Sequence, residues 1–180
     1  YNTEVGTLTV WGPLEINIEC ALGDNCGVTG VQGLGLEEYS SRAMVIAKNG
    51  TCGNVTSRPL TGFPGTPTAI SNLATEKGTA FYWGLIKPTA IVPNIYDACW
   101  CHKGLPCTDV TDFRAPLGKV SVKGPNRWTE SKLCGTGKDC VVTISGLFLT
   151  PHDSMVMTKG GCTTGILALA GKTSAQLKSR

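Results

Sequence analysis

A cysteine-framed sequence pattern occurs twice in this chain, once near its start and once in its last third. Residues 6–13 (GTLTVWGP) return as residues 118–125 (GKVSVKGP). Further matches follow in the same order: Cys20 and Cys26 with Cys134 and Cys140, Gly33-Leu34-x-Leu36 with Gly146-Leu147-x-Leu149, and Cys52 with Cys162. Such duplication is typical of modular scaffolds, which are built by repetition and used for their surface.

The repeat predicts the domain organisation of the chain. Residues 1–53 are expected to form a partial β repeat and residues 79–163 a complete one. Residues 54–78 include the turn-forming run Gly-Phe-Pro-Gly-Thr-Pro and are expected to be an irregular connector. Residues 164–180 are expected to be a C-terminal tail that packs on an edge of the core.

The hydrophobic periodicity favours strands. Residues 7–11 alternate polar and apolar side chains, and the run ends in Gly-Pro, which terminates a strand. Residues 80–86 and 95–101 are expected to be a further pair of strands. In the second of these, Asp97, Cys99 and Cys101 share one face, and Tyr96, Ala98 and Trp100 share the other. The chain is therefore predicted to be all-β, with disulfide-stapled, sandwich-like repeat units, one partial and one complete.

Nine cysteines in 180 residues indicate a disulfide framework. Three pairs enclose five turn-forming residues, a spacing that a disulfide closes without strain: Cys20–Cys26, Cys101–Cys107 and Cys134–Cys140. Persistent disulfides require an oxidising compartment, which excludes an ordinary cytosolic enzyme. A metal site made by Cys99, Cys101, His102 and Cys107 is the competing interpretation, although the other two loops contain no histidine.

Three cysteines remain after these pairs are assigned. Cys52 and Cys162 occupy equivalent repeat positions, so either is a candidate partner for Cys99. We expect Cys162 to be the partner because it belongs to the same complete repeat as Cys99. Cys52 is then a free thiol or is bonded to another chain.

The second copy of the pattern resembles a known cysteine-rich repeat. The matching residues are Tyr96-x-x-Cys99-Trp100-Cys101, Gly118-x-Val120-x-Val122-x-Gly124-Pro125, Cys134-x5-Cys140, Gly146-Leu147-x-Leu149 and Gly161-Cys162. They resemble the tandem repeats of large secreted and surface proteins of the cysteine-repeat modular type, found in dinoflagellates and their apicomplexan relatives among the alveolates. The first copy lacks the Tyr-x-x-Cys-Trp-Cys half. The resemblance implies an adhesive or structural module and no catalytic residue.

Catalytic chemistry has little support in the sequence. His152, Asp153 and Ser154 are adjacent, and neighbours on a strand point to opposite faces, so these three cannot form a relay. The chain has no nucleophile elbow, phosphate-binding loop, dinucleotide fingerprint or zinc-protease motif. We expect no catalytic residue, no metal and no cofactor, and the chain is not expected to be an enzyme.

The expected partners are other protein subunits. A net charge of +3 is too small to indicate nucleic-acid binding, and no apolar run approaches the length that spans a bilayer. Trp11 and Trp128 are candidate partner contacts, whereas Trp83 and Trp100 are expected to pack in a core or an interface. Asn49 and Asn54 begin glycosylation sequons, which are compatible with secretion.

These observations favour a non-catalytic structural or docking module of a larger assembly in an oxidising compartment. An extracellular coat, appendage or adhesive protein of the cell surface is the first interpretation. A lumenal accessory subunit of an algal photosynthetic membrane complex, in the thylakoid lumen, and a carbohydrate-binding module are the alternatives. Because the first copy lacks strands equivalent to residues 80–107, we expect it to have an open edge or face. Either the second copy, the connector or a partner that contacts Trp11 and residues 7–11 must cover it.

Overall fold

The computed structural model describes residues 6–127, 133, 141–155 and 176–179. The chain divides into two compact units: unit 1 is Tyr1–Val122 and unit 2 is Lys123–Arg180. This division differs from the predicted one, whose boundaries after residues 53 and 78 both fall inside unit 1. The difference arises because strands of the predicted partial repeat pair with strands of the predicted complete repeat.

Strands and two short 3₁₀ turns make up the regular structure, and no α-helix occurs among the described residues, so the predicted all-β class is confirmed. The strands are β1 (Gly12–Pro13), β2 (Ile16–Ala21), β3 (Asn25–Val28), β4 (Gly33–Leu34), β5 (Arg42–Ile46), β6 (Phe81–Leu85), β7 (Asn94–Cys101), β8 (Ala115–Pro125), β9 (Thr143–Leu147) and β10 (Gln176–Ser179). The turns are η1 (Glu76–Gly78) and η2 (Val110–Asp112). Within the same described residues, no helix has the length and apolar character needed to cross a membrane.

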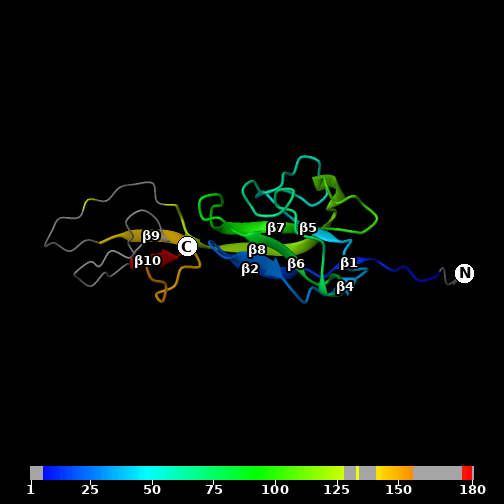
Figure 1. The fold of residues 1–180 in the computed structure, drawn as a ribbon, viewed down its shortest axis with the longest axis horizontal. Coiled ribbons are helices and arrows are strands. Elements are labelled where there is room, and N and C mark those ends of the chain that lie inside the picture. Colours follow the sequence, from blue (N-terminus) through cyan, green and yellow to red (C-terminus); the bar gives the residue numbers. More distant parts are fainter. Residues whose placement is uncertain (1–5, 128–132, 134–140, 156–175, 180) are drawn as a thin grey trace, which may run out of the picture. The chain divides into compact units, whose positions relative to one another are not determined.

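β8 is one of the two inner strands of the main sheet of unit 1 (Figure 1). It pairs with β2 and, antiparallel, with β7, which pairs in turn with β5. β3 and β6 form a separate antiparallel pair. The predicted strands at residues 80–86 and 95–101 are formed, as β6 and β7, but they do not pair with each other. β5 and β8 occupy both edges of β7, and β6 takes β3 as its partner.

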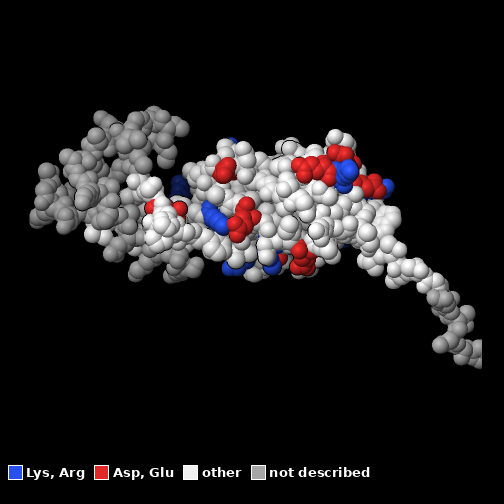
Figure 2. Space-filling view, turned by 90° about the horizontal axis from the view of Figure 1, so that it is seen from below, with Lys and Arg blue, Asp and Glu red and all other residues white. Residues whose placement is uncertain are grey.

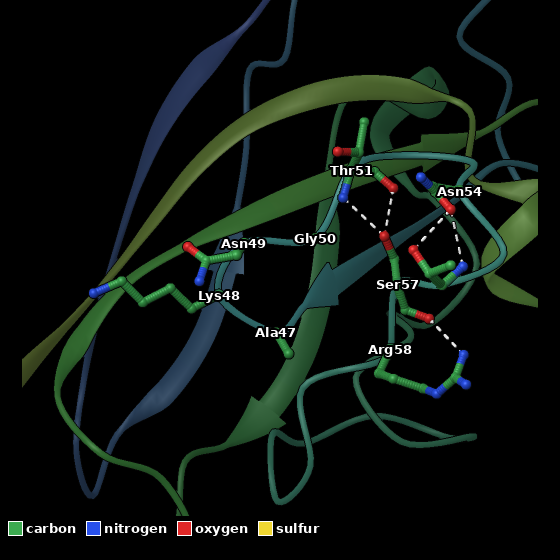
Figure 3. Close-up of a pocket in the computed structure, with 9 residues that line it drawn as sticks. Ala47, Lys48, Asn49, Gly50, Thr51, Asn54, Ser57 and Arg58 are labelled. Carbon is green, nitrogen blue, oxygen red and sulfur yellow. Dashed lines mark hydrogen bonds between the residues drawn. The ribbon is translucent and has the colours of Figure 1, made fainter.

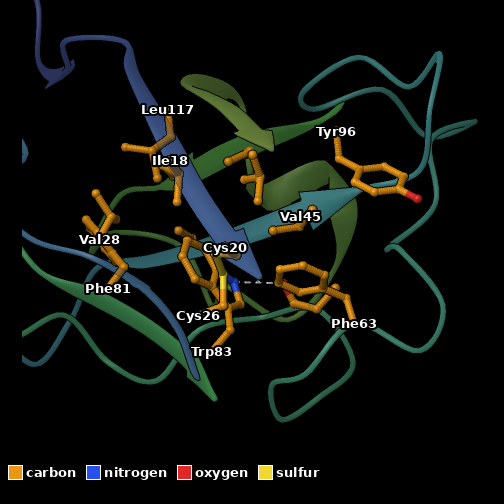
Figure 4. Packing of buried hydrophobic residues seen from close by; sticks show 14 of the residues in the cluster. Ile18, Cys20, Cys26, Val28, Val45, Phe63, Phe81, Trp83, Tyr96 and Leu117 are labelled. Atoms are coloured by element: carbon orange, nitrogen blue, oxygen red, sulfur yellow. Dashed lines mark hydrogen bonds between the residues drawn. A yellow bond between two sulfur atoms is a disulfide. The ribbon is translucent and has the colours of Figure 1, made fainter. Parts of the chain in front are cut away.

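Strand β7 carries buried side chains on both of its faces. Tyr96, Ala98 and Trp100 belong to one hydrophobic cluster, whereas Cys99 and Cys101 belong to another, as the alternation predicts. The larger cluster also takes side chains from β2, β3, β5, β6 and β8, and Figure 4 shows part of it. The smaller cluster draws on the connections that follow β5 and β7. The sheet thus supports a main core on one face and disulfide-bonded loops on the other.

Unit 2 begins within β8. The last two residues of this strand pair antiparallel with β9, with Gly124 opposite Leu147 and Pro125 opposite Gly146. β9 also pairs in parallel with β10, so residues 176–179 of the predicted tail lie along a strand. The other residues of that tail, 164–175 and 180, lie outside the described residues.

Candidate functional site

Two of the predicted disulfides are confirmed in unit 1. Cys20–Cys26 joins the end of β2 to β3, and Cys101–Cys107 closes the loop after β7. Both loops contain the five turn-forming residues that predicted them. The third predicted local pair, Cys134–Cys140, lies outside the described residues, as does Cys162.

The favoured partner of Cys99 was predicted wrongly. Cys99 is bonded to Cys52, with Cα atoms 5.5 Å apart, so Cys52 is neither a free thiol nor bonded to another chain. The prediction placed these cysteines in different repeats, but β5 pairs with β7 and places Met44 opposite Cys99. The connection that leaves β5 then brings Cys52 onto the same face. Had residues 1–53 and 79–101 been assigned to one folding unit, Cys52 would have been the expected partner of Cys99.

The competing metal site is also overturned. Cys99, Cys101 and Cys107 all form disulfides, so they offer no thiolate to a metal ion. In the part of the chain that the structure describes, no group of three or more potential metal ligands comes together.

His102 lies between two tryptophan rings. Its ring centroid is 5.4 Å from that of Trp11 and 5.6 Å from that of Trp100. The Gly104 N–H donates to His102 Nδ1 at 3.1 Å. Nε2 is buried and has no hydrogen-bond partner. Among the described residues, His102 therefore packs against two indole rings and accepts one hydrogen bond through Nδ1.

Three of the four tryptophans lie in the described part of the chain, and they differ in exposure. Trp83 and Trp100 are buried in the main core, as expected, whereas Trp11 is 54% exposed. Trp11 packs over Gly35, where an added Cβ would lie 3.0 Å from the indole ring. Trp128 lies outside the described residues. Among the tryptophans that the structure describes, Trp11 alone has the exposure that a contact residue needs.

The two sequon asparagines line a pocket of about 200 Å³ in the loop after β5 (Figure 3). Both Asn49 and Asn54 are exposed. Asn54 Oδ1 accepts hydrogen bonds from the backbone N–H and the hydroxyl of Thr56, at 2.9 Å each. Ser57 in the pocket donates its hydroxyl to the Thr51 carbonyl and accepts from the Thr51 N–H. The pocket is therefore lined by a loop whose polar groups hydrogen-bond to one another.

His152, Asp153 and Ser154 are exposed residues of unit 2. The Thr150 N–H donates to the Asp153 carboxylate at 2.6 Å, and the Asp153 N–H donates to the Thr150 carbonyl. Asp153 thus closes a local turn. This geometry gives it no relay role with the histidine beside it.

Charged side chains on the described surface are mixed in sign. Figure 2 shows Lys and Arg interspersed with Asp and Glu on the face that it displays. Ion pairs join Lys103 to Glu37 and Lys119 to Asp97. Exposed pairs of this kind contribute little to stability and create no field of one sign that would attract a polyanion.

Residues 7–11 are the most exposed apolar segment near the start of the described chain. Leu8 is 88% exposed and Val10 is 75% exposed. The segment forms no strand and pairs with none of the strands that the structure describes. The predicted strand over these residues is therefore not formed here, although its alternating pattern is that of a strand with one buried face.

The Gly-Pro dipeptide that follows the alternating residues pairs with a Gly-Leu dipeptide in both units. Gly12 lies opposite Leu34 and Pro13 opposite Gly33, as Gly124 lies opposite Leu147 and Pro125 opposite Gly146. The approach is equally close in the two places. A Cβ added to Gly33 would lie 2.3 Å from the Gly12 carbonyl oxygen, and a Cβ added to Gly146 would lie 2.3 Å from the Gly124 carbonyl oxygen. Matched sequence positions thus take matched partners.

Searches against protein-family models, curated proteins and solved structures found no match.

Proposed function

We propose that this chain is a non-catalytic structural module, part of a tandem array of disulfide-stapled β units that builds a larger assembly. The recurring strand pair carries the proposal. The Gly-Pro of β1 meets the Gly-Leu of β4 in one register, and the same dipeptides meet in the same register at the junction of β8 and β9. A pairing that recurs at matched sequence positions supports two copies of one structural unit.

Contacts beside this strand pair support the duplication. Trp11 and Lys123 are equivalent positions, and so are Gly35 and Phe148. Trp11 packs over Gly35 in the first copy, whereas Lys123 Nζ lies 5.4 Å from the centre of the Phe148 ring in the second. The large aromatic ring has changed sides, but the contact between the two positions is kept. Two positions that stay in contact while the aromatic residue moves from one to the other indicate that the two copies share one structure.

The proposed repeat has a different phase from the one that the sequence predicted. Unit 1 is complete when it begins at β1 and ends within β8, near residue 122. Residues from 123 onward then begin the next unit. We propose sandwich-like packing for the complete unit, because β3 and β6 contribute to the same core cluster as the sheet formed by β2, β8, β7 and β5.

The proposed location is the cell surface or an extracellular structure such as a coat, an appendage or an adhesive protein. Three disulfides in unit 1 suggest an oxidising compartment. The exposed sequons at Asn49 and Asn54 favour a secreted protein. A carbohydrate-binding strip has less support, because Trp83 and Trp100 are both in the core.

The proposal is tested on protein isolated from its native source without reductant. We expect the chain to migrate in a complex or polypeptide much larger than 18.9 kDa. Peptide mapping should recover Cys52–Cys99 in oxidised form, and glycan on Asn49 or Asn54 would place the protein on the secretory route. A free 18.9 kDa monomer with reduced cysteines would contradict the proposal.

A further inference from the structure

We infer that residues 7–11 are the last strand of another β unit of the same kind, one that precedes β1 and whose sheet has an open place for them. The inference rests on the proposed function, since it names the partner that a tandem array would supply to this segment. The proposed partner of residues 7–11 is the sheet of that preceding unit. In this sheet the segment would lie between strands equivalent to β2 and β7, as β8 does in unit 1.

The apolar side chains support this assignment. Leu8 and Val10 are equivalent to Val120 and Val122 of β8. Both valines are fully buried in the main core of unit 1, whereas Leu8 and Val10 are largely exposed. The alternation that buries one face of β8 is therefore present in residues 7–11 without a core to fill. Exposing two such side chains is unfavourable, and a sheet with a free place would remove them from water.

The glycine before this segment supports it independently. Gly118 has a φ of 138°, and a Cβ added to it would lie 1.9 Å from the Ile16 carbonyl oxygen. Its equivalent, Gly6, also has a positive φ of 112°, but an added Cβ there would meet no atom within 4 Å. At Gly118, β8 needs a glycine because β2 approaches closely. Gly6 is also a glycine, although no strand of unit 1 approaches it.

The register of β8 defines the partner surface. Val120 lies opposite Tyr96 and Val122 opposite Asn94 in β7. Leu8 and Val10 should take the corresponding positions against the β7-like strand of the partner. Main-chain hydrogen bonds on both sides would provide affinity, and the two apolar side chains would fix the register, since a slip of one residue turns them to the outer face.

The first test exchanges strands within the full chain. Lys119→Thr, Val120→Leu and Ser121→Thr together copy residues 7–9 into β8, and residue 122 is already valine, as residue 10 is. We expect this variant to keep the Cys52–Cys99 disulfide and slow amide exchange in β7. The matched control, Lys119→Leu, Val120→Thr and Ser121→Leu, moves the apolar side chains to the outer face and should lose that protection. Loss of protection in the first variant, while Val120→Leu alone remains folded, would overturn the inference.

The second test does not depend on how the core of unit 1 tolerates leucine. A second copy of residues 12–117 is joined directly before Gly6 of residues 6–180, so that residues 6–11 follow it as residues 118–123 follow residue 117. Amides of residues 7–10 should exchange at least about 100-fold more slowly than in the single chain, the factor that about 3 kcal/mol of local stability gives. Leu8→Asp should abolish this protection in the tandem and leave the single chain unchanged.

Equally fast exchange of residues 7–10 in the tandem and the single chain would overturn the inference. Both tests use purified protein and read strand formation directly. They are therefore independent of the native compartment and of the assembly found there. A failure of the proposed function in native material and a failure of the strand assignment would be seen in different measurements.

Discussion

Gly118 in β8 lies directly against the backbone of Ile16 at the start of β2. A Cβ added to Gly118 would come within 1.9 Å of the Ile16 carbonyl oxygen, and the φ of 138° is one that side chains rarely adopt. The contact lies where β8, an inner strand of the main sheet of unit 1, meets one of its neighbours, β2. Close packing of β2 on β8 therefore depends on the missing side chain.

Gly118→Ala is expected to lower the free energy of unfolding of unit 1 by at least about 2 kcal/mol, because it adds both a backbone clash and an unfavourable φ. Urea denaturation followed by tryptophan fluorescence measures the change. Gly6→Ala is the matched control, since Gly6 has a φ of 112° but open space around it. Equal effects of the two substitutions would show that contact with Ile16 is unimportant.

Replacing both Cys52 and Cys99 by alanine is expected to cost more stability than replacing both Cys20 and Cys26. The first disulfide joins residues 47 positions apart and the second joins residues 6 apart. Loop-closure entropy predicts a difference of about 2 kcal/mol between the two double variants. Chemical denaturation under non-reducing conditions measures it. Equal losses would mean that packing around the sulfurs, rather than chain entropy, controls the outcome.

Alkaline pH is expected to destabilise unit 1 through Tyr96. Burial raises the pKa of the Tyr96 hydroxyl, which donates to the Val92 carbonyl at 2.7 Å. The unfolded chain therefore releases this proton at a lower pH than the folded chain. The contribution of neutral Tyr96 to the stability of the folded state is complete below the ordinary tyrosine pKa of about 10. It is lost as the pH rises through the pKa of Tyr96 in the folded state.

Tyr96→Phe should weaken this alkaline decline, and unfolding midpoints measured between pH 8 and pH 11, a range that brackets the ordinary tyrosine pKa of about 10, would show it. Tyr82→Phe is the matched control because Tyr82 is exposed and should leave the decline in place. A decline of the same size in Tyr96→Phe and the parent protein would assign it to other groups.

Trp11→Ala is expected to destabilise unit 1 by about 1 kcal/mol, the effect of exposing roughly half of a buried aromatic side chain. The ring packs against Gly35 and His102 but remains 54% exposed. Acrylamide should quench Trp11 strongly in the single chain. Quenching that is unchanged in Trp11→Ala would show that the accessible fluorescence comes from another tryptophan.

Local features of unit 1 could be predicted from the sequence because they depend on neighbouring residues. A five-residue turn brings Cys20 to Cys26 whatever strands β2 and β3 pair with. The alternation along β7 places Tyr96 and Cys99 on opposite faces whatever strands pair with it. Both predictions needed only the backbone period and the length of a loop.

Non-local partners could not be predicted in the same way. The choice of Cys52 for Cys99 depends on β5 lying beside β7, and the choice of β3 for β6 depends on which sheet edges remain free. Sequence repetition also marks equivalent positions without showing where one unit ends. Residues 118–122 look like the start of the repeat, yet in the structure they close unit 1.

The Cys52–Cys99 bond also determines how far this chain can be drawn out under tension. A pull applied to residues on either side of the bond passes from residue 52 to residue 99 through the sulfur atoms, so the 47-position segment between them carries no load. Reduction would release about 160 Å of additional contour length, at roughly 3.5 Å per residue. A chain built of such units therefore has a shorter maximum length while this disulfide is oxidised than after it is reduced.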